Sequence, residues 1–429
     1  MDRSRLKKWK VIVTAVGGLF FPQRTTLGLD SRALTPGLVE RITYATAESR
    51  SHKRAALVLK KVGGNSVSAS TVERVAQDVG QELVQLRDEA PSRLPRNLVP
   101  SAPADPPTLA VVECDGGRIR TREPGHGPGV HKHAWRETKN ACLVKMTHQT
   151  FEVDPQPNLP DCFRDHRHVA DLAEMGLPEG YSPTEPSDGK LSQDELGTRE
   201  DWRPKRLVRT CLSSMVEAKE FGKQMNREAR RRRFHEAPHR AFLGDGLPWN
   251  WTIWKRCFKN FVPILDFIHA LTYLYQAAVS QYTDLRLSWN CYLEWAQTCW
   301  SGRVYEVLEQ LGTKLDEHDI KREGKLDERH PHKPLLDAYR YLTTNQSRMD
   351  YARYRQLGLP VTTALMESLV KEINQRAKGT EMFWNDPDGG EYILQIRSAA
   401  LCDDDRLSLY LENRPGHAYV RRSTSRRAA

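Results

Sequence analysis

Residues 109–117 read LAVVECDGG, and residues 241–246 read AFLGDG. In each stretch an apolar run leads into an Asp-Gly pair, at Asp115 in the first and at Asp245 in the second. Apolar runs of this kind predict buried strands, and a glycine beside the acid lets a ligand approach the backbone closely. Ligands bind at the carboxyl ends of strands in open α/β sheets, so both carboxylates are candidate site residues. Each Asp-Gly pair taken alone is also an ordinary turn dipeptide.

Further strands are predicted around these two stretches. A turn at 115–117 separates the first strand from a polar–apolar alternation, and a Gly/His/Pro-rich loop leads to the third strand. The predicted strands are Leu109–Cys114, Arg118–Arg122, Lys139–Met146, Arg240–Leu243, Phe261–Leu265 and a last one near Glu391–Ile396.

Apolar residues at helical spacing predict helices before, between and after these strands. Ser70 and Glu73 form a candidate capping box that starts a helix after a Gly-Gly break. A helix, a glycine turn and a capped second helix are the layout of a DNA-binding helix-turn-helix, and equally of an ordinary helical hairpin. The other predicted helices are Leu38–Ala47, His52–Val62, Ser213–Arg233, a helical region over His269–Tyr341, and Thr363–Arg376.

These patterns divide the chain into five expected regions. The first ends in a Pro-rich linker, and the second contains a long loop over 151–205. The expected regions are 1–105 (helical, with the helix-turn-helix-like unit and the linker), 106–268 (first part of the sheet), 269–355 (a helical insertion), 356–412 (last part of the core) and 413–429 (a basic tail).

Composition narrows the class of protein. The 429 residues carry 65 Lys and Arg against 55 Asp and Glu, a net charge of +10 that favours a polyanionic partner. Ten tryptophans and 39% hydrophobic residues exclude a wholly disordered chain. The eight cysteines form no C-x-x-C pair, so a thiolate zinc site or disulfide scaffold is not expected and a reducing cytoplasm fits. No stretch has the length of a membrane-spanning helix.

A third acid, Glu367, lies in the helix VTTALMESLVKEINQRAKG, beside the apolar stripe that packs on the core. Lys371, Asn374 and Lys378 continue its row, so one flank could hold a metal and then follow a phosphate backbone. The alternative is a surface Glu–Lys pair at i, i+4. Three acids suit phosphodiester cleavage, because two Mg²⁺ or Mn²⁺ ions stabilise the attacking and leaving oxygens and prefer carboxylate ligands.

Other polar groups are weaker candidates. Asp266 and His269 form a D-x-x-H pair, either a zinc site or a capping Asp with a hydrogen-bonded His. The run Arg230, Arg231, Arg232, Arg233 is either a solvated helix end or a DNA contact, and the charge favours DNA. No metal is assigned to His126, His131 or His133, and core positions are predicted for Trp289, Trp295 and Trp300.

The chain resembles the ISKra group of bacterial insertion-sequence transposases from about Leu27 onward. The likeness is carried most specifically by the block ending in RAKGTEMFW and by the pair LGDG…ILDFIHA. Further matching segments are VVECDGGRIRTR, AFLGDGLPWNWTIWKRCF, ILDFIHALTYLY, TTNQSRMDYARYRQLGLPVTTALMESLVKEINQRAKGTEMFW and LQIRSAALC.

This resemblance implies a DDE transposase with an RNase H-like mixed sheet flanked by helices, and a helical insertion before the last acid. It implies that Asp115, Asp245 and Glu367 are the catalytic, metal-binding acids for two Mg²⁺ or Mn²⁺ ions. Asp266 and His269 would lie beside that active site. The implied partners are double-stranded DNA, at element ends and target, and further copies of the chain on that DNA, in the bacterial cytoplasm with the nucleoid.

One difference from the group lies near the start. Its members are expected to carry a Cys-rich stretch before an LGLD segment, which here is Leu27–Asp30, yet no cysteine precedes Cys114. The interpretation is an N-terminally shortened copy with intact acids. The rival functions are a degenerate transposase that binds DNA without cutting it, and a structural protein whose basic faces bind RNA or acidic partners. An assay of metal-dependent DNA nicking distinguishes the first rival from an active transposase. The salt dependence of binding to DNA and to RNA distinguishes the second.

Overall fold

The computed structural model describes residues 11–13, 18–20, 29, 32, 34–89, 97–122, 135–177, 202–379 and 382–414. Several predicted features therefore lie outside the described residues. These are His126, His131 and His133, most of Leu27–Asp30, the basic tail Arg421–Arg427 and the loop residues 178–201. Two short strands, β1 (Val11–Val13) and β2 (Gly18–Phe20), pair with each other in antiparallel sense.

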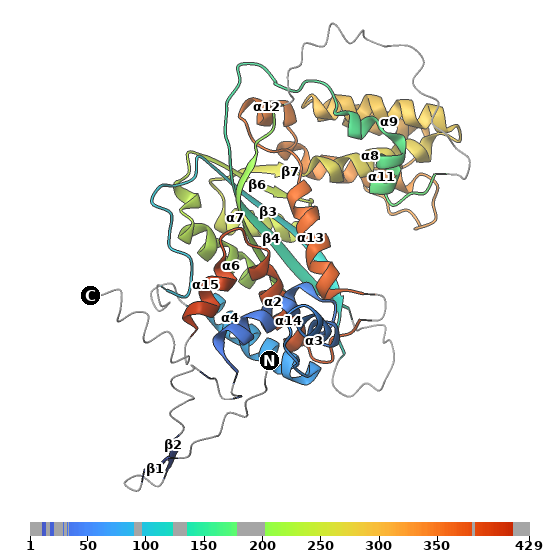
Figure 1. Ribbon diagram of the computed structural model, residues 1–429. Coiled ribbons are helices and arrows are strands. Elements are labelled where there is room, and N and C mark those ends of the chain that lie inside the picture. Colours follow the sequence, from blue (N-terminus) through green and yellow to red (C-terminus); the bar gives the residue numbers. More distant parts are fainter. Residues whose placement is uncertain are drawn as a thin grey trace, which may run out of the picture.

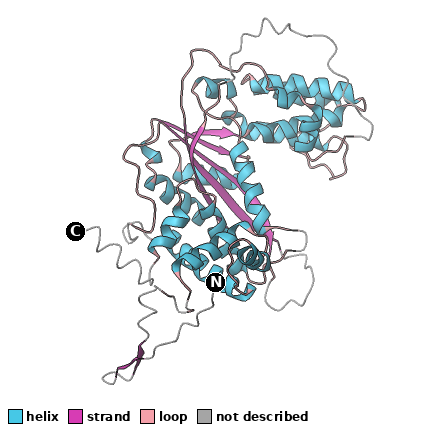
Figure 2. Ribbon diagram, in the orientation of Figure 1, coloured by secondary structure: helices cyan, strands magenta, loops and turns pink. Residues whose placement is uncertain are grey.

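A five-stranded mixed sheet forms the centre of the molecule (Figures 1 and 2). Its strands lie in the order β5-β4-β3-β6-β7. The first three strands in this order are joined by antiparallel pairing of β4 with β3 and β5, whereas β6 and β7 run parallel to β3. Numbered along the chain, the order is 3-2-1-4-5 with the second strand reversed, which confirms the expected RNase H-like sheet. The strands are β3 (Leu109–Arg120), β4 (Trp135–Met146), β5 (Arg206–Ser214), β6 (His239–Gly244) and β7 (Val262–Leu265).

Two sequence predictions about β3 and β5 were wrong. The expected turn at 115–117 does not form, because β3 continues through it and pairs Asp115 with Asn140 and Gly117 with Thr138. Cross-strand hydrogen bonds along the whole β3–β4 hairpin outweigh the turn preference of Asp-Gly. The segment Arg206–Ser214, which was assigned to no strand, is β5, so the helix predicted from Ser213 begins only at Ala218.

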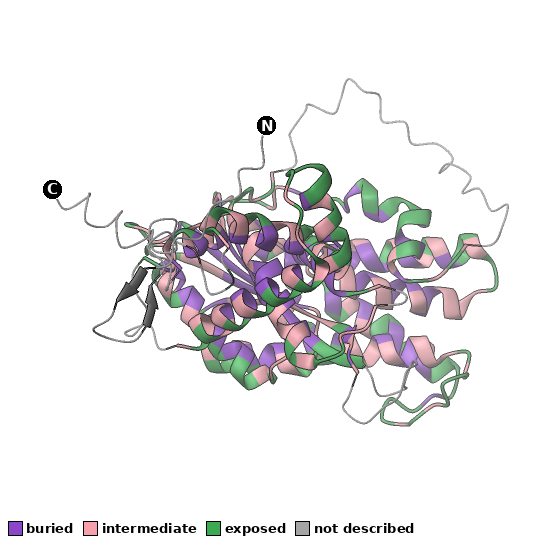
Figure 3. Ribbon diagram, turned by 60° about the horizontal axis from the view of Figure 1, so that its bottom comes forward, coloured by how far each residue is buried: buried purple, intermediate pink, exposed green. Residues whose placement is uncertain are grey.

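Helices cover both faces of the sheet. In strand register, Glu113 pairs with Cys142 and Cys114 with Ala141, so Cys114 and Cys142 point to opposite faces. The Cys114 thiol contacts Asn250 of α7 (Pro248–Cys257), and the Cys142 thiol contacts the Leu365 carbonyl of α13 (Ala364–Ala377). α6 (Ala218–Arg231) packs against α7, and α14 (Pro387–Ala400) packs against α13 and β5. Figure 3 shows the buried sheet between these layers.

The segment predicted as a strand near Glu391–Ile396 is part of helix α14, so that prediction was wrong. Asp386 caps the helix by accepting from the Asp388 N–H, and Pro387 occupies the first turn. Ile393 and Ile396 then pack in an apolar core with the N-terminal helices. Capping and long-range packing therefore decide this segment, although its β-branched and aromatic residues resemble a strand.

A group of helices lies beyond the end of β7, between β7 and α13 (Figure 1). Trp295 and Trp300 are buried there, as predicted, and Trp289 is packed against the same core. The helical prediction over 269–341 is confirmed. The elements here are α8 (Phe267–Gln281), α9 (Leu285–Trp300), α10 (Val304–Glu317), α11 (Lys333–Asn345), η3 (Gln346–Arg348) and α12 (Tyr351–Gln356). Within the expected long loop, η1 (Asp161–Arg164) and α5 (His166–Leu172) form, and η2 (Phe234–Glu236) follows α6.

The N-terminal helices form a second apolar core with the C-terminal ones. α2 (Pro36–Glu48), α3 (His52–Lys61) and α4 (Ala69–Asp88) pack with α14 and with α15 (Arg406–Asn413). Ser68, not Ser70, caps α4 by accepting from the Thr71 N–H at 3.1 Å. DNA binding by the α3–α4 pair stays a prediction. Within the described ranges, none of the helices combines the length and apolar composition that crossing a bilayer requires.

Candidate active site

Three acids occupy one row across the ends of neighbouring parallel strands. The β3–β6 register pairs Cys114 with Gly244, so Asp115 and Asp245 stand at the next position of each strand. The β6–β7 register pairs Gly244 with Leu265, which puts Asp266 next in the same row. The backbone N–H of Asp266 donates to the Gly244 carbonyl at 2.9 Å and extends this pairing. The structure therefore brings together two of the three predicted catalytic acids, Asp115 and Asp245, with Asp266 of the predicted D-x-x-H pair.

Asp115 and Asp245 lie close enough for each carboxyl group to influence the pKa of the other. Burial, followed by the charge of Asp245, raises the pKa of Asp115 to about 7. Burial also raises the pKa of Asp245 above its ordinary value. Two neighbouring carboxyl groups with raised pKa values mark a place where a cation is favoured, because each negative charge disfavours the other.

The loop after β6 holds Asp245 in place. Its Oδ1 accepts from the Leu247 N–H at 3.0 Å and from the amide of Asn250, a fully buried residue at the start of α7. The Tyr341 hydroxyl from α11 donates to the Asp245 carbonyl at 2.6 Å. Gly246 follows with φ of +94°, and a Cβ there would lie 2.7 Å from the Tyr341 ring. Only glycine fits this position, so the Asp-Gly pair serves the geometry of the row.

Asp266 is fully buried and orients His269. Its Oδ2 accepts from His269 Nδ1 at 2.7 Å and from the His269 N–H at 3.3 Å, while Oδ1 accepts from the Thr363 N–H at 2.9 Å. The interpretation as a capping Asp with a hydrogen-bonded His is confirmed. Burial lowers the pKa of His269, but the bond to Asp266 and the charges of Asp245 and Asp115 outweigh it and raise the pKa to about 9. An imidazolium therefore lies beside the carboxyl pair at neutral pH.

Glu367 lies in the first turn of α13, on the sheet face that also carries Glu113 and Asp115. Its carboxylate forms a 3.6 Å ion pair with Lys371, the surface pair that the i, i+4 spacing allowed. Among the described residues no hydrogen bond or ion pair joins Glu367 to Asp115 or Asp245. The role of Glu367 as third acid stays a prediction.

Glu113 is a group that sequence reasoning missed. It is buried on β3, two residues before Asp115 and on the same face, and with Glu367 it lines a cavity of about 420 Å³. Burial and the charge of Asp266 raise the pKa of Glu113 to about 8, so this side chain is protonated at neutral pH. Its signal in the sequence is an acid inside an otherwise apolar strand, VVEC, which a buried strand tolerates only when the acid is neutralised.

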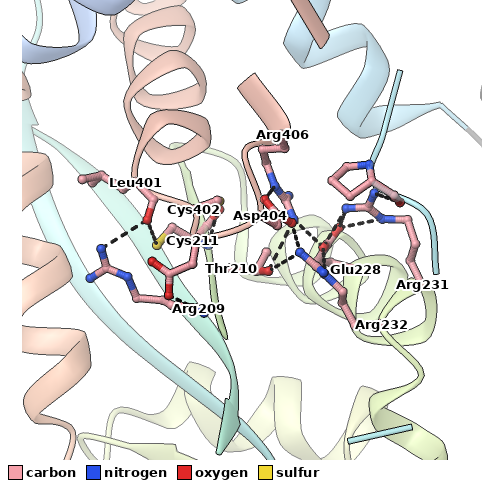
Figure 4. Close-up of polar contacts among 12 residues, drawn as sticks. Arg209, Thr210, Cys211, Glu228, Arg231, Arg232, Leu401, Cys402, Asp404 and Arg406 are labelled. Carbon is pink, nitrogen blue, oxygen red and sulfur yellow. Dashed lines mark hydrogen bonds and ion pairs between the residues drawn. The ribbon is translucent and has the colours of Figure 1, made fainter. Parts of the chain in front are cut away.

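The arginine run at the end of α6 is engaged within the protein. Figure 4 shows Arg231 and Arg232 converging on Glu228 together with Arg406 from α15. Arg232 also pairs with Asp404 and donates to the Thr210 hydroxyl at 2.8 Å. Arg233 pairs with Glu236 at 2.6 Å, and Arg230 is exposed. DNA contact by this run stays a prediction, and it would compete with these ion pairs.

The side chains of this site suit the binding of a hard divalent cation only in part. Over the described stretches, no three His, Cys, Asp or Glu side chains are already arranged to hold a metal ion. Asp115 and Asp245 nevertheless stand side by side, and a divalent cation bound between them would offset the repulsion of their charges. Mg²⁺ uses one or two carboxylates and completes its shell with water and phosphate. These two residues fit one such ion, and a second ion stays a prediction.

The fold and this row of acids define a mixed α/β protein with an RNase H-like sheet and a pair of neighbouring carboxyl groups at its strand ends. No protein-family model matches the chain, and no curated protein matches its sequence. Among solved structures, the chain is similar to a Drosophila P element transposase strand transfer complex. The TM-score is 0.30 and the sequence identity 10%, over 86% of this chain and 93% of that chain. The assignment of the sheet rests on its strand order and register.

Proposed function

We propose that this protein is an insertion-sequence transposase of the ISKra kind, which cleaves and joins DNA strands with Mg²⁺ or Mn²⁺. The observation that carries the proposal is the row in which Asp115 and Asp245 stand side by side at the ends of neighbouring parallel strands. The RNase H-like strand order and the sequence segments that resemble this group support it. The excess of ten positive charges suits a DNA partner.

Each residue of the row has a role in this proposal. Asp115 and Asp245 would hold a divalent ion, and Glu367 would contribute to a second one. Divalent ions at such a site stabilise the charge that develops on the oxygens around a phosphodiester. Asp266 fixes the ring of His269 through Nδ1, so the other ring nitrogen is directed away from Asp266. The His269 imidazolium adds positive charge beside the place where a DNA phosphate would bind.

A nicking assay tests this proposal. Supercoiled DNA is incubated with Mg²⁺ or Mn²⁺ and with wild-type protein or the variants Asp115→Asn, Asp245→Asn and Glu367→Gln. We expect wild-type nicking, its loss by at least a hundredfold in both Asp variants, and DNA affinity within about twofold of wild type. Matched exposed controls are Asp171→Asn in α5 and Glu309→Gln in α10.

Each outcome has a defined meaning. Nicking that persists in either Asp variant overturns the proposal. Nicking that persists in Glu367→Gln alone removes only Glu367 from the assigned residues. A wild-type protein that binds DNA and never nicks it, with either metal, identifies the non-catalytic alternative.

A further inference from the structure

A group of basic residues lies on the outer side of α7 and at the end of α6. It consists of Arg230, Lys255, Arg256 and Lys259, and all four residues are exposed. We propose that this α7 basic face binds the phosphate backbone of double-stranded DNA. The inference rests on the proposed action on DNA and adds a DNA-binding surface that lies apart from the row of acids.

The helical spacing of α7 puts its basic residues on one side. Ile253 is buried on the inner side of the helix, whereas Thr252, Lys255 and Arg256 are exposed. Positions three and four residues apart lie on the same face of a helix, so these three exposed residues share the outer face. Lys259 is exposed in the turn that follows the helix. The outer face of α7 therefore becomes strongly basic toward its carboxyl end.

α6 brings Arg230 to the same surface. The two helices pack closely side by side (Figure 1), because a Cβ at Gly222 of α6 would lie only 3.1 Å from Ile253 Cγ1. Burial raises the pKa of the Cys257 thiol at the end of α7, and the charges of Arg256 and Arg230 lower it. Both guanidinium groups therefore lie near one thiol, and the end of α6 extends the basic face of α7.

The cations of the α7 basic face have no carboxylate partner. Across the described parts of the chain, none of the four side chains forms an ion pair or a hydrogen bond. The neighbouring Arg231 and Arg232, by contrast, are neutralised by Glu228. Helix dipoles favour cations in the last turns of α6 and α7, but that weak attraction leaves their charge available to a partner. Exposed charges of one sign on adjoining helix ends repel one another, and a polyanion relieves that repulsion.

The position of the α7 basic face separates it from the row of acids. α7 begins three residues after Asp245 and packs on the sheet face to which Cys114 points, opposite to that of Asp115. Lys255 and Arg256 lie in its last turn, about 11 Å along the helix axis from its first residue. This position suits contact with a duplex that extends beyond the acids, and not with the phosphate that reacts there.

Salt-dependent DNA binding tests the inference. Fluorescence anisotropy with a short labelled DNA duplex compares wild type with Lys255→Gln/Arg256→Gln over a range of salt concentrations, in EDTA so that no divalent ion contributes. Each lost phosphate contact lowers the slope of log K against log salt by about 0.9, so the double variant should lower it by about 2 and weaken binding about tenfold. The matched control is Lys325→Gln/Arg329→Gln, which changes one exposed lysine and one exposed arginine between α10 and α11.

The outcomes separate this inference from the proposed function. Wild-type slope and affinity in the double variant overturn the inference, and so does an equal loss in the control, which would reflect overall charge. Neither result affects the proposed function, because the nicking assay tests the acids separately. If the double variant does not fold by circular dichroism, Lys259→Gln decides instead, with a slope change of about 1 expected. Tighter binding of a duplex RNA of the same sequence overturns DNA as the partner of this face. A wild-type protein that binds no DNA removes the inference and the proposed function together.

Discussion

Replacing Asp115 by Asn should stabilise the metal-free protein while abolishing its proposed activity. A carboxyl group whose pKa is higher in the folded protein than in the unfolded chain binds its proton more tightly when folded. Folded-state stability therefore falls as the pH rises from the unfolded pKa, 3.8, to the folded pKa, about 7, and the loss is complete above that range. Asn fills nearly the same volume and has no proton to lose.

The size of the effect follows from the two pKa values. A difference of about three pKa units at 1.36 kcal/mol each gives a gain of up to about 4 kcal/mol in the free energy of unfolding at pH 8. The gain should shrink toward zero as the pH approaches 4, where wild-type Asp115 is protonated in both states. Mg²⁺ should stabilise wild type and have little effect on Asp115→Asn, because the ion would offset the repulsion between the two carboxylates.

Urea unfolding followed by tryptophan fluorescence measures this effect, in EDTA at pH 8 and at pH 4.5. Asp171→Asn, an exposed carboxylate on α5, is the matched control and should change stability little at either pH. A variant Asp115→Asn that is no more stable than wild type at pH 8 without metal would refute the repulsive carboxyl pair, and with it the physical basis of the proposed ion site.

Two further predictions concern the ion pairs around this fold. Glu228→Gln should lower the free energy of unfolding at pH 7 by about 3 kcal/mol, because it leaves buried guanidinium groups without their shared carboxylate. Since those charges depress the pKa of Glu228, the difference in the free energy of unfolding between this variant and wild type should narrow only in strong acid. The control Glu236→Gln, which changes an exposed ion pair, should show no such loss of stability in urea unfolding. Asp266→Asn should lower the pKa of His269 from about 9, as read from the pH dependence of its ring proton in NMR spectra; an unchanged pKa would mean that Asp266 does not charge this histidine.

The row of acids was predictable because it depends on local pattern and sheet geometry. An apolar run ending in an acid predicts a strand with a carboxylate at its carboxyl end, and parallel neighbours bring such ends together. Asp115 and Asp245 followed from that rule. The continuation of β3 past Asp115 did not, because it depends on pairing with Asn140 and Thr138 of a strand that begins only at Trp135.

Buried ion pairs explain the other differences between the sequence predictions and the structure. β5 contains Arg209, which is buried and forms a 2.9 Å ion pair with Glu372 of α13. A sequence shows an arginine without its distant partner, so a core strand that contains one resembles an exposed segment. For the arginines at 230–233, too, the sequence does not show the carboxylates with which they pair. Their density suggested a free basic surface, whereas Glu228 and Asp404 neutralise two of them.

The second apolar core has a consequence for biosynthesis. α4 has its valine stripe covered by α14, and about 300 residues separate the two helices along the chain. The ribosome synthesises α4 long before α14. The apolar valine stripe of α4 therefore stays exposed until almost the whole chain has emerged. We therefore expect chaperones to bind the N-terminal helices during translation. Premature termination shortly before Pro387 would leave α2, α3 and α4 without the helix that completes their fold.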